Sequence, residues 1–411
     1  MSMRWKLGWM MFLEFFIWGG WYVTVSNYMA AHGMDMKIAI VFSLCPIAAI
    51  ISPFFLGMVA DRFFASEKVL GVLSFLSGLT LLAVPLFAPG YNPKLFVPIL
   101  LVHTLCYMPT LSLTSSLAFH HVEDQEKEFP IIRVFGTIGW IVANWVVSGV
   151  FHGDTHVIQF YAAGIAALVL GLYSFTLPHT PAPSAGKKAT IHDILGLDSL
   201  ALLKNPMFLI FIVCSLLICI PLAFYYAYAS LYVKTVGFPD PAVTMSFGQI
   251  FEIFFMLLMP ILFLRLGVKY MLFAGMCAWV VRYGLFAAAA AHDLKALVVL
   301  GIILHGICYD FFFVTGQIYV DRVTSPKIRG QVQGFLVLVT QGVGMLIGAR
   351  TAGFIFAKVT NVVHNTTVTH FQMLWLIPCI AAGVIALVFV MTFHEGGKID
   401  EGGKIDMEVA A

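Results

Sequence analysis

The chain has 411 residues, of which 60% are hydrophobic and 11% are charged, and its net charge is +2. Soluble globular domains are about 25% charged, so this composition excludes a soluble protein and predicts a chain that crosses the lipid bilayer many times. The small net charge gives no reason to expect a nucleic-acid partner. None of the seven cysteines belongs to a CxxC pair, so neither a disulfide framework nor a metal site is predicted.

A membrane-crossing helix needs about 20 mostly apolar residues. Applied along the chain, this rule predicts an all-α polytopic membrane protein of twelve transmembrane helices in two six-helix halves. The spans are 7–28, 37–60, 69–89, 95–119, 131–151, 157–177, 207–233, 242–265, 268–290, 296–321, 329–357 and 372–393.

The longest polar connection falls between the sixth and seventh spans. It divides the chain into an N-terminal half (1–178), a cytoplasmic linker (179–206), a C-terminal half (207–394) and a disordered cytoplasmic tail (395–411). Lysine and arginine gather in the connections that share a side with the N-terminus. By the positive-inside rule, both termini are expected to be cytoplasmic.

Charged residues inside spans are costly, and they usually face a bundle interior or a wet cavity. The first of them is Glu14, which shares a helix face with Trp18 and Trp21. The spacing leaves two roles open for Glu14: lining a cavity, or holding helices together.

The fifth span contains FPIIRVFGTIGWI, in which Arg133, Thr137 and Trp140 follow the spacing i, i+4, i+7 and share one face. A cation, a hydroxyl and an aromatic ring on one stripe suit a polar ligand with an aromatic ring. The alternative is that Arg133 pairs with a neighbouring helix while Trp140 only fills space.

The eighth span contains SFGQIFEIFF, which places Gln249 and Glu252 one turn apart. An amide beside a carboxylate can bind donors and acceptors of a solute. The same pair can also bridge two helices, so both interpretations remain open.

The tenth span carries Asp310 in its apolar interior, with His305 and Tyr309 beside it. A carboxylate that alternates between dry and wet surroundings can take up and release a proton. Asp310 and Glu252 are therefore the candidates for proton coupling. The alternative for Asp310 is a static salt bridge to Arg133 or Arg282.

The loop GMVADRFFASEKV resembles the GxxxDR signature of the major facilitator superfamily. It joins the second and third spans, where that signature occurs. The resemblance implies that Asp61 caps a helix and pairs with charges across the interface between the halves during gating, and that Arg62 extends this network.

Further stretches resemble one branch of that superfamily, the nucleoside:proton symporters. They are spread in order over most of the chain and include FIWGGW, FPIIRVFGTIGWI, QIFE, AWVVRYGLF, YDFFFVTGQIYV and SPKIRGQVQGF. The resemblance implies a central cavity and the uptake of nucleosides with protons. It also implies the substrate contacts, which fall on Arg133, Thr137, Trp140, Gln249, Glu252, His305, Tyr309 and Asp310.

The chain departs from this branch in the seventh span, IPLAFYYAYAS, where Ala223 and Tyr226 stand in place of amide side chains. Phe313 replaces an asparagine and Glu14 a glutamine. Tyr226 is therefore included among the substrate contacts.

We predict a proton-coupled importer of nucleosides that is a monomer in the bacterial inner membrane and works by alternating access without a cofactor. One alternative is the same fold carrying another polar solute, such as a sugar or a modified nucleoside. A second is a membrane receptor that binds its ligand without moving it. The chain contains no HExxH or GxSxG motif, so an enzyme is not expected.

Overall fold

The computed structural model describes residues 2–55, 63–87, 94–182, 197–325, 328–363 and 366–395. The predicted gating residues Asp61 and Arg62 lie outside this described part, as does the tail from residue 396. The chain forms two compact units. The first unit is Met1–Ala189 with Val233–Ser246, and the second is Thr190–Tyr232 with Phe247–Ala411.

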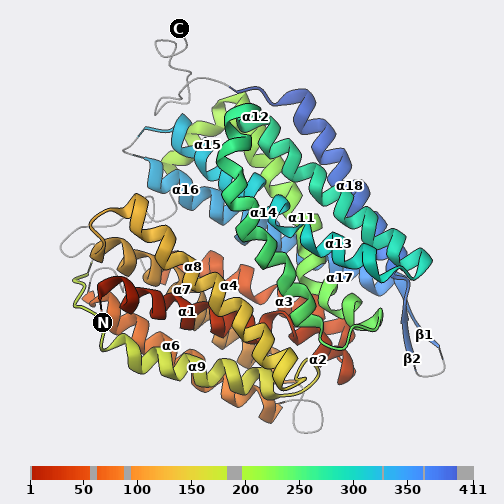
Figure 1. The fold of residues 1–411 in the computed structure, drawn as a ribbon, viewed down its shortest axis with the longest axis horizontal. Coiled ribbons are helices and arrows are strands. Elements are labelled where there is room, and N and C mark those ends of the chain that lie inside the picture. Colours follow the sequence, from red (N-terminus) through yellow and green to blue (C-terminus); the bar gives the residue numbers. More distant parts are fainter. Residues whose placement is uncertain are drawn as a thin grey trace. The chain divides into compact units, whose positions relative to one another are not determined.

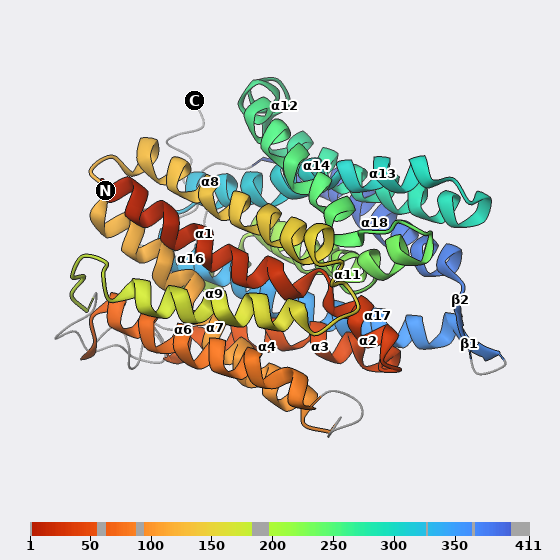
Figure 2. The same cartoon turned by 60° about the horizontal axis from the view of Figure 1, so that its bottom comes forward.

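The first unit is built from helices. In order they are α1 (Met3–Tyr22), α2 (Val25–Ala31), the 3₁₀-helix η1 (Asp35–Lys37), α3 (Ile38–Phe42), α4 (Leu44–Phe55), α6 (Ser66–Ala83), the 3₁₀-helix η3 (Val84–Phe87), α7 (Phe96–His121), α8 (Gln125–Asn144), the π-helix η4 (Trp145–Val150) and α9 (Ile158–Ser174). Helix α1 packs against both α8 and α9, and α6 packs against α7 and α9. Figure 2 shows α1 lying between α8 and α9.

The second unit continues the helical pattern (Figure 1). Its elements are the 3₁₀-helix η5 (Leu197–Lys204), α11 (Pro206–Thr235), α12 (Pro241–His292), α13 (Lys295–Ile303), α14 (His305–Tyr309), the π-helix η6 (Asp310–Val314), α15 (Thr315–Val323), α16 (Arg329–Val337), the π-helix η7 (Leu338–Gly344), α17 (Met345–Val359), β1 (Thr360–Val363), β2 (Thr366–Thr369) and α18 (Phe371–Thr392). Helix α12 covers two predicted spans and is interrupted at Gly267, whose φ of 67° suits glycine.

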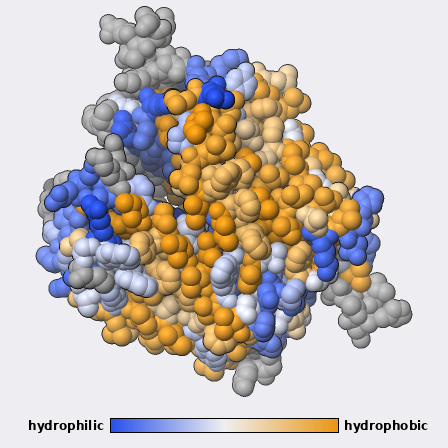
Figure 3. Space-filling view, viewed as in Figure 1, coloured by the Kyte–Doolittle hydropathy of each residue, from blue (hydrophilic) through white to orange (hydrophobic). Residues whose placement is uncertain are grey.

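Among the described residues, nine helices are long and apolar enough to cross a bilayer. The 20-residue α1 and the 17-residue α9 are not among these nine, and the 52-residue α12 is counted once. Large apolar side chains lie on the outside of the spans, as Leu257 and Leu264 do on α12 with 74% and 88% exposure. Figure 3 shows apolar residues over α12 and α13. Exposed apolar surface of this extent is expected of helices in contact with lipid.

A short β-hairpin is the one feature of the described chain that departs from the all-helical expectation. Strands β1 and β2 pair antiparallel, with Thr360 opposite Thr369. The hydroxyls of these two threonines lie 3.0 Å apart. The segment TNVVHNTTVT is rich in β-branched residues, which favour strands and pack well across a hairpin.

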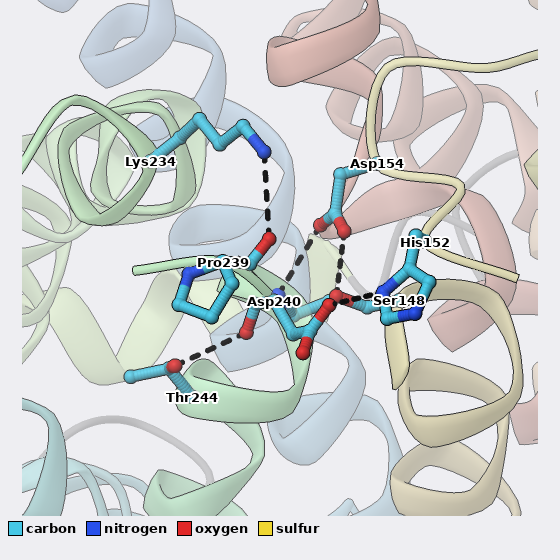
Figure 4. A network of polar contacts seen from close by, with 8 residues as sticks. Ser148, His152, Asp154, Lys234, Pro239, Asp240 and Thr244 are labelled. Carbon is cyan, nitrogen blue, oxygen red and sulfur yellow. Dashed lines mark hydrogen bonds and ion pairs between the residues drawn. The ribbon is translucent and has the colours of Figure 1, made fainter. Parts of the chain in front are cut away.

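A polar network joins the turn after η4 to the segment before α12, and all of it belongs to the first unit (Figure 4). The carboxylate of Asp154 accepts hydrogen bonds from Ser148 Oγ at 2.6 Å and from the Ala242 backbone N–H at 3.3 Å. His152 Nδ1 lies 2.8 Å from Asp240 Oδ1. The N-terminal N–H groups of a helix lack partners within the helix, so Asp154 supplies an acceptor to α12 from a distant part of the chain.

Candidate functional site

The predicted residues of α8 are held by very close packing against α1. A Cβ atom at Gly139 would overlap the Phe12 carbonyl, so the two backbones touch there. Arg133 lies with its guanidinium carbon 4.1 Å from the centroid of the Phe15 ring on α1. A cation over an aromatic face is attracted by the ring. Within the described chain, Arg133 forms no ion pair.

Trp140 stands one turn beyond Thr137 and meets Trp18 of α1 edge to face, with ring centroids 5.6 Å apart. The indole N–H groups of Trp18 and Trp140 are buried and have no hydrogen-bond partner among the described residues. Buried donors of this kind are uncommon and call for a partner. The first unit thus brings together Arg133, Thr137 and Trp140, with two buried indole donors beside them.

Glu14 is fully buried beside this group. Its Oε1 accepts a hydrogen bond of 2.6 Å from Thr110 Oγ1, and its backbone carbonyl accepts one of 2.7 Å from the Tyr107 hydroxyl. Both donors come from α7. Glu14 therefore joins α1 to α7, which is the structural one of its two predicted roles, although Oε2 has no partner in the described residues.

In the second unit, α12 presents Glu252 next to His305 of α14. Gly306 makes this approach possible, because a Cβ atom there would overlap the backbone of Glu252. His305 Nε2 lies 3.9 Å from Glu252 Oε2, which is too long for a direct hydrogen bond. Gln249, one turn earlier, has a buried carbonyl oxygen without a partner in the described chain.

Asp310 is fully buried, and neither carboxylate oxygen has a hydrogen-bond partner among the described residues. It begins the π-helix η6, directly after Tyr309. Single π-helical turns inside α-helices occur frequently at functional sites. Arg282 lies in the same unit, and the predicted salt bridge from Asp310 to Arg282 is absent from the described part of the structure.

Arg282 instead forms a cluster that the sequence analysis did not predict. Its side chain is fully buried, its guanidinium carbon lies 3.3 Å from the centroid of the Tyr225 ring, and its Nη1 lies 3.2 Å from His305 Nδ1. Tyr225 also stacks on His305, with centroids 5.4 Å apart. The available signal was a lone arginine in an apolar span, but spacing along one helix cannot identify partners on two others.

The seventh span contributes aromatic rings from α11. Tyr226 is half-buried next to Tyr225, with ring centroids 5.8 Å apart. Ala223 is buried and packs closely under Gly348 of α17. Ala223 therefore serves helix packing, and the polar contacts of this span fall to its tyrosines.

The two units offer complementary chemistry. The first contributes a cation, a hydroxyl and indole donors, and the second contributes an amide, two carboxylates, an imidazole and tyrosine rings. No group of three or more potential metal ligands occurs in the parts of the chain that the structure describes. Side chains of these kinds suit a solute that has a flat ring and several hydrogen-bonding edges.

Comparison of the chain with known proteins identifies its family. The family model described as nucleoside H+ symporter matches residues 1–398. The chain is 38% identical to the putative nucleoside transporter YegT of Escherichia coli, over 98% of this chain and 96% of YegT. It is 30% identical to the nucleoside permease NupG of the same organism, over 96% of each chain. It is 31% identical to the E. coli xanthosine permease, over 97% of this chain and 98% of that protein.

Solved structures agree with this assignment. The crystal structure of NupG superposes with a TM-score of 0.84 at 29% identity, over 96% of this chain and all of the other. A D-xylose–proton symporter shares the fold, with a TM-score of 0.70 at 16% identity over 98% of this chain and all of that one. These proteins are transporters rather than enzymes, as the sequence predicted. The chain belongs to the nucleoside H+ symporter family.

Proposed function

We propose that the chain is a proton-coupled transporter that imports nucleosides across the bacterial inner membrane by alternating access. The observation that carries the proposal is the carboxylate of Asp310, which is buried and has no hydrogen-bond partner among the described residues. The chain belongs to a family of proton symporters. A charge in such a place is costly, so a carboxyl group there is stabilised when it holds a proton. Uptake and release of that proton is the coupling step.

We assign the substrate contacts from the chemistry of the polar and aromatic side chains in each unit. Trp140 and Tyr226 stack on the base, because aromatic faces bind a flat ring without regard to its edges. Gln249, Glu252 and His305 bind hydroxyls and base edges through hydrogen bonds, and Thr137 adds a hydroxyl. Arg133 donates hydrogen bonds to the substrate, while Tyr309 flanks the coupling group. Glu252 is the second proton-coupling candidate.

We propose that the transporter has twelve spans in two six-helix halves, with both termini cytoplasmic. Lysine and arginine gather in the connections that lie on the same side of the membrane as the N-terminus, which supports this orientation. Asp61 and Arg62 would act at the gate between the halves. We propose a monomer that uses protons and no cofactor.

Uptake of labelled uridine and adenosine tests the proposal, in cells that lack their own nucleoside carriers, with and without a protonophore. We expect accumulation above the external concentration that collapses with the protonophore. Counterflow in proteoliposomes separates a carrier from a receptor, because only a carrier exchanges solute across a sealed membrane. A well-expressed chain that moves neither nucleoside would contradict the substrate class.

A second substrate class is favoured by one observation. The seventh span presents the tyrosines of α11 and no amide next to Ala223, so a purine-like or modified nucleoside, or another polar solute, could bind in preference to uridine. Competition of labelled adenosine uptake by uridine, xanthosine and D-xylose ranks these candidates. Stronger competition by xanthosine or D-xylose than by uridine would favour the second class.

A further inference from the structure

Arg282 carries a permanent positive charge into a fully buried position of the second unit. Within the described chain it has no acidic partner at ion-pair distance. Its guanidinium lies on the Tyr225 ring at 3.3 Å, where the ring face attracts a cation. A buried charge held in this way is costly to keep. Arg282 Nη1 lies 3.2 Å from the Nδ1 atom of His305.

The chemistry of that contact determines which nitrogen of His305 carries a proton. A guanidinium has only donors, so Nδ1 must accept the hydrogen bond from Arg282. A neutral imidazole that accepts through Nδ1 has its proton on Nε2. A proton on Nδ1 would place two donors against each other. The Nε2 atom faces the carboxylate of Glu252 at 3.9 Å, which is an acceptor and suits an Nε2–H group.

The groups around the imidazole are compatible with this assignment. Arg282 and Glu252 approach from α12, Tyr225 stacks on the ring from α11, and Tyr309 lies on the next turn of the same chain segment with its ring 6.0 Å away. Stacking by Tyr225 fixes the plane of the ring. The hydrogen bond from Arg282 to Nδ1 then fixes the rotation of the ring within that plane.

We propose that Arg282 is a positioning residue that holds His305 as the Nε2–H tautomer, so that the site presents a hydrogen-bond donor beside the Glu252 acceptor. The gap of 3.9 Å between these atoms is too long for a direct bond. A solute group that both accepts and donates, such as a hydroxyl or the C(=O)–NH edge of a base, can bind to both. This inference rests on the proposed function and assigns Arg282 a role in its substrate specificity.

Two substitutions of His305 separate the roles of its nitrogens. Glutamine places an amide donor near the position of Nε2, whereas asparagine places its amide near Nδ1 and leaves the Nε2 position empty. We expect His305→Gln to bind uridine about tenfold more tightly than His305→Asn, the usual size of one hydrogen bond. Binding to purified protein is measured by calorimetry, and adenosine is tested in parallel. Equal affinities of the two variants would overturn the proposal.

Arg282→Met tests the positioning role itself. In the wild-type background we expect it to weaken uridine binding about tenfold, because His305 loses the group that fixes its tautomer. In the His305→Gln background the same change should have less than about twofold effect, since the amide donor needs no tautomer. A purely structural role for Arg282 would give the same loss in both backgrounds, and that result would contradict the inference.

The design separates failure of the inference from failure of the proposed function. Wild-type protein that binds neither uridine nor adenosine contradicts the function, whatever the variants do. Wild-type protein that binds, together with equal effects of Arg282→Met in both backgrounds, contradicts only the role of Arg282. If Arg282→Met does not fold, as judged by gel filtration, the glutamine and asparagine pair still decides the donor assignment.

Discussion

The two fully buried acids of the membrane helices, Glu14 in the first unit and Asp310 in the second, have different surroundings. Glu14 accepts a hydrogen bond of 2.6 Å from Thr110. Asp310 accepts none among the described residues and begins a π-helical turn. An acid that is bonded to a neighbouring helix holds that helix in place. An acid without a bond has no structural reason to be there, which favours a role in proton transfer.

Substitution of Asp310 should have the largest effect and tests the comparison directly. Asp310→Asn removes the proton site, and we expect it to abolish accumulation of uridine against a gradient, a loss of roughly 100-fold or more, while counterflow exchange persists. Uptake and counterflow in proteoliposomes give both quantities. Glu14→Gln is the matched control, because its amide oxygen can still accept from Thr110.

Two outcomes would break the comparison between the two acids. Full concentrative uptake by Asp310→Asn would remove the coupling role from Asp310. Loss of accumulation in Glu14→Gln would show that Glu14 also takes part in proton transfer. Glu252→Gln, measured beside them, shows whether the second carboxylate shares the coupling.

Arg133 sharpens the comparison by separating binding from coupling. Arg133→Met removes a charge that has no ion pair in the described chain, so the fold should tolerate it. We expect the KM for uridine to rise about tenfold, as for the loss of a charge-assisted hydrogen bond, while the accumulation that remains is still abolished by a protonophore. A variant with wild-type KM would exclude Arg133 from the substrate contacts.

Thr110→Val converts Glu14 into an unpartnered acid like Asp310. A buried acceptor left without its donor costs about 1–3 kcal/mol, so the unfolding temperature in detergent should fall. Thr114→Val is the control, because among the described residues the Thr114 hydroxyl bonds carbonyls of its own helix. The Thr110 hydroxyl makes such a contact too, to Tyr107, and differs in its bond to Glu14. If the two variants have the same stability, the bond between Thr110 and Glu14 does not stabilise the unit.

Asp154 offers a third buried acid, outside the membrane spans, and gives the smallest expected effect. Burial raises the pKa of its carboxyl group, although the hydrogen bonds from Ser148 and Ala242 oppose the shift. The folded protein therefore keeps this proton to a higher pH than the unfolded chain does. The stability that Asp154 contributes is present at low pH and is lost as the pH rises from the ordinary aspartate range through the raised pKa.

Unfolding temperatures of the wild type and of Asp154→Asn across this pH range measure the effect. The difference, wild type minus variant, should decrease as the pH rises, because only the wild type has a carboxyl group that ionises there. A difference that grows with pH would mean that the bonds from Ser148 and Ala242 outweigh the burial.

Much of the architecture could be predicted because it depends on local sequence. A run of apolar residues specifies a span by its own length, and the positions of Arg133, Thr137 and Trp140 on one face follow from helix geometry. The β-hairpin was missed because a short polar segment between spans reads as a loop. The division of α12 at Gly267 was predicted from the boundary between two apolar runs.

Partners on different helices could not be predicted in the same way. Charge alone suggested that Asp310 pairs with Arg133 or Arg282, whereas the structure places Arg282 against Tyr225 and His305. The bond between Thr110 and Glu14 joins residues 96 positions apart. Such contacts depend on how helices pack, and the sequence of one helix contains no record of its neighbour.

The segment Val233–Ser246 belongs by its contacts to the first unit, yet it is continuous with α11 and α12, which belong mainly to the second. Its junctions, between Tyr232 and Val233 and between Ser246 and Phe247, fall inside these two helices rather than in the turn that joins them. A movement of one unit against the other would then bend α11 and α12 at these junctions. The hinges of this transporter are accordingly to be sought in helical backbone, where a proline or glycine placed at a junction would change the rate of turnover while leaving the substrate contacts intact.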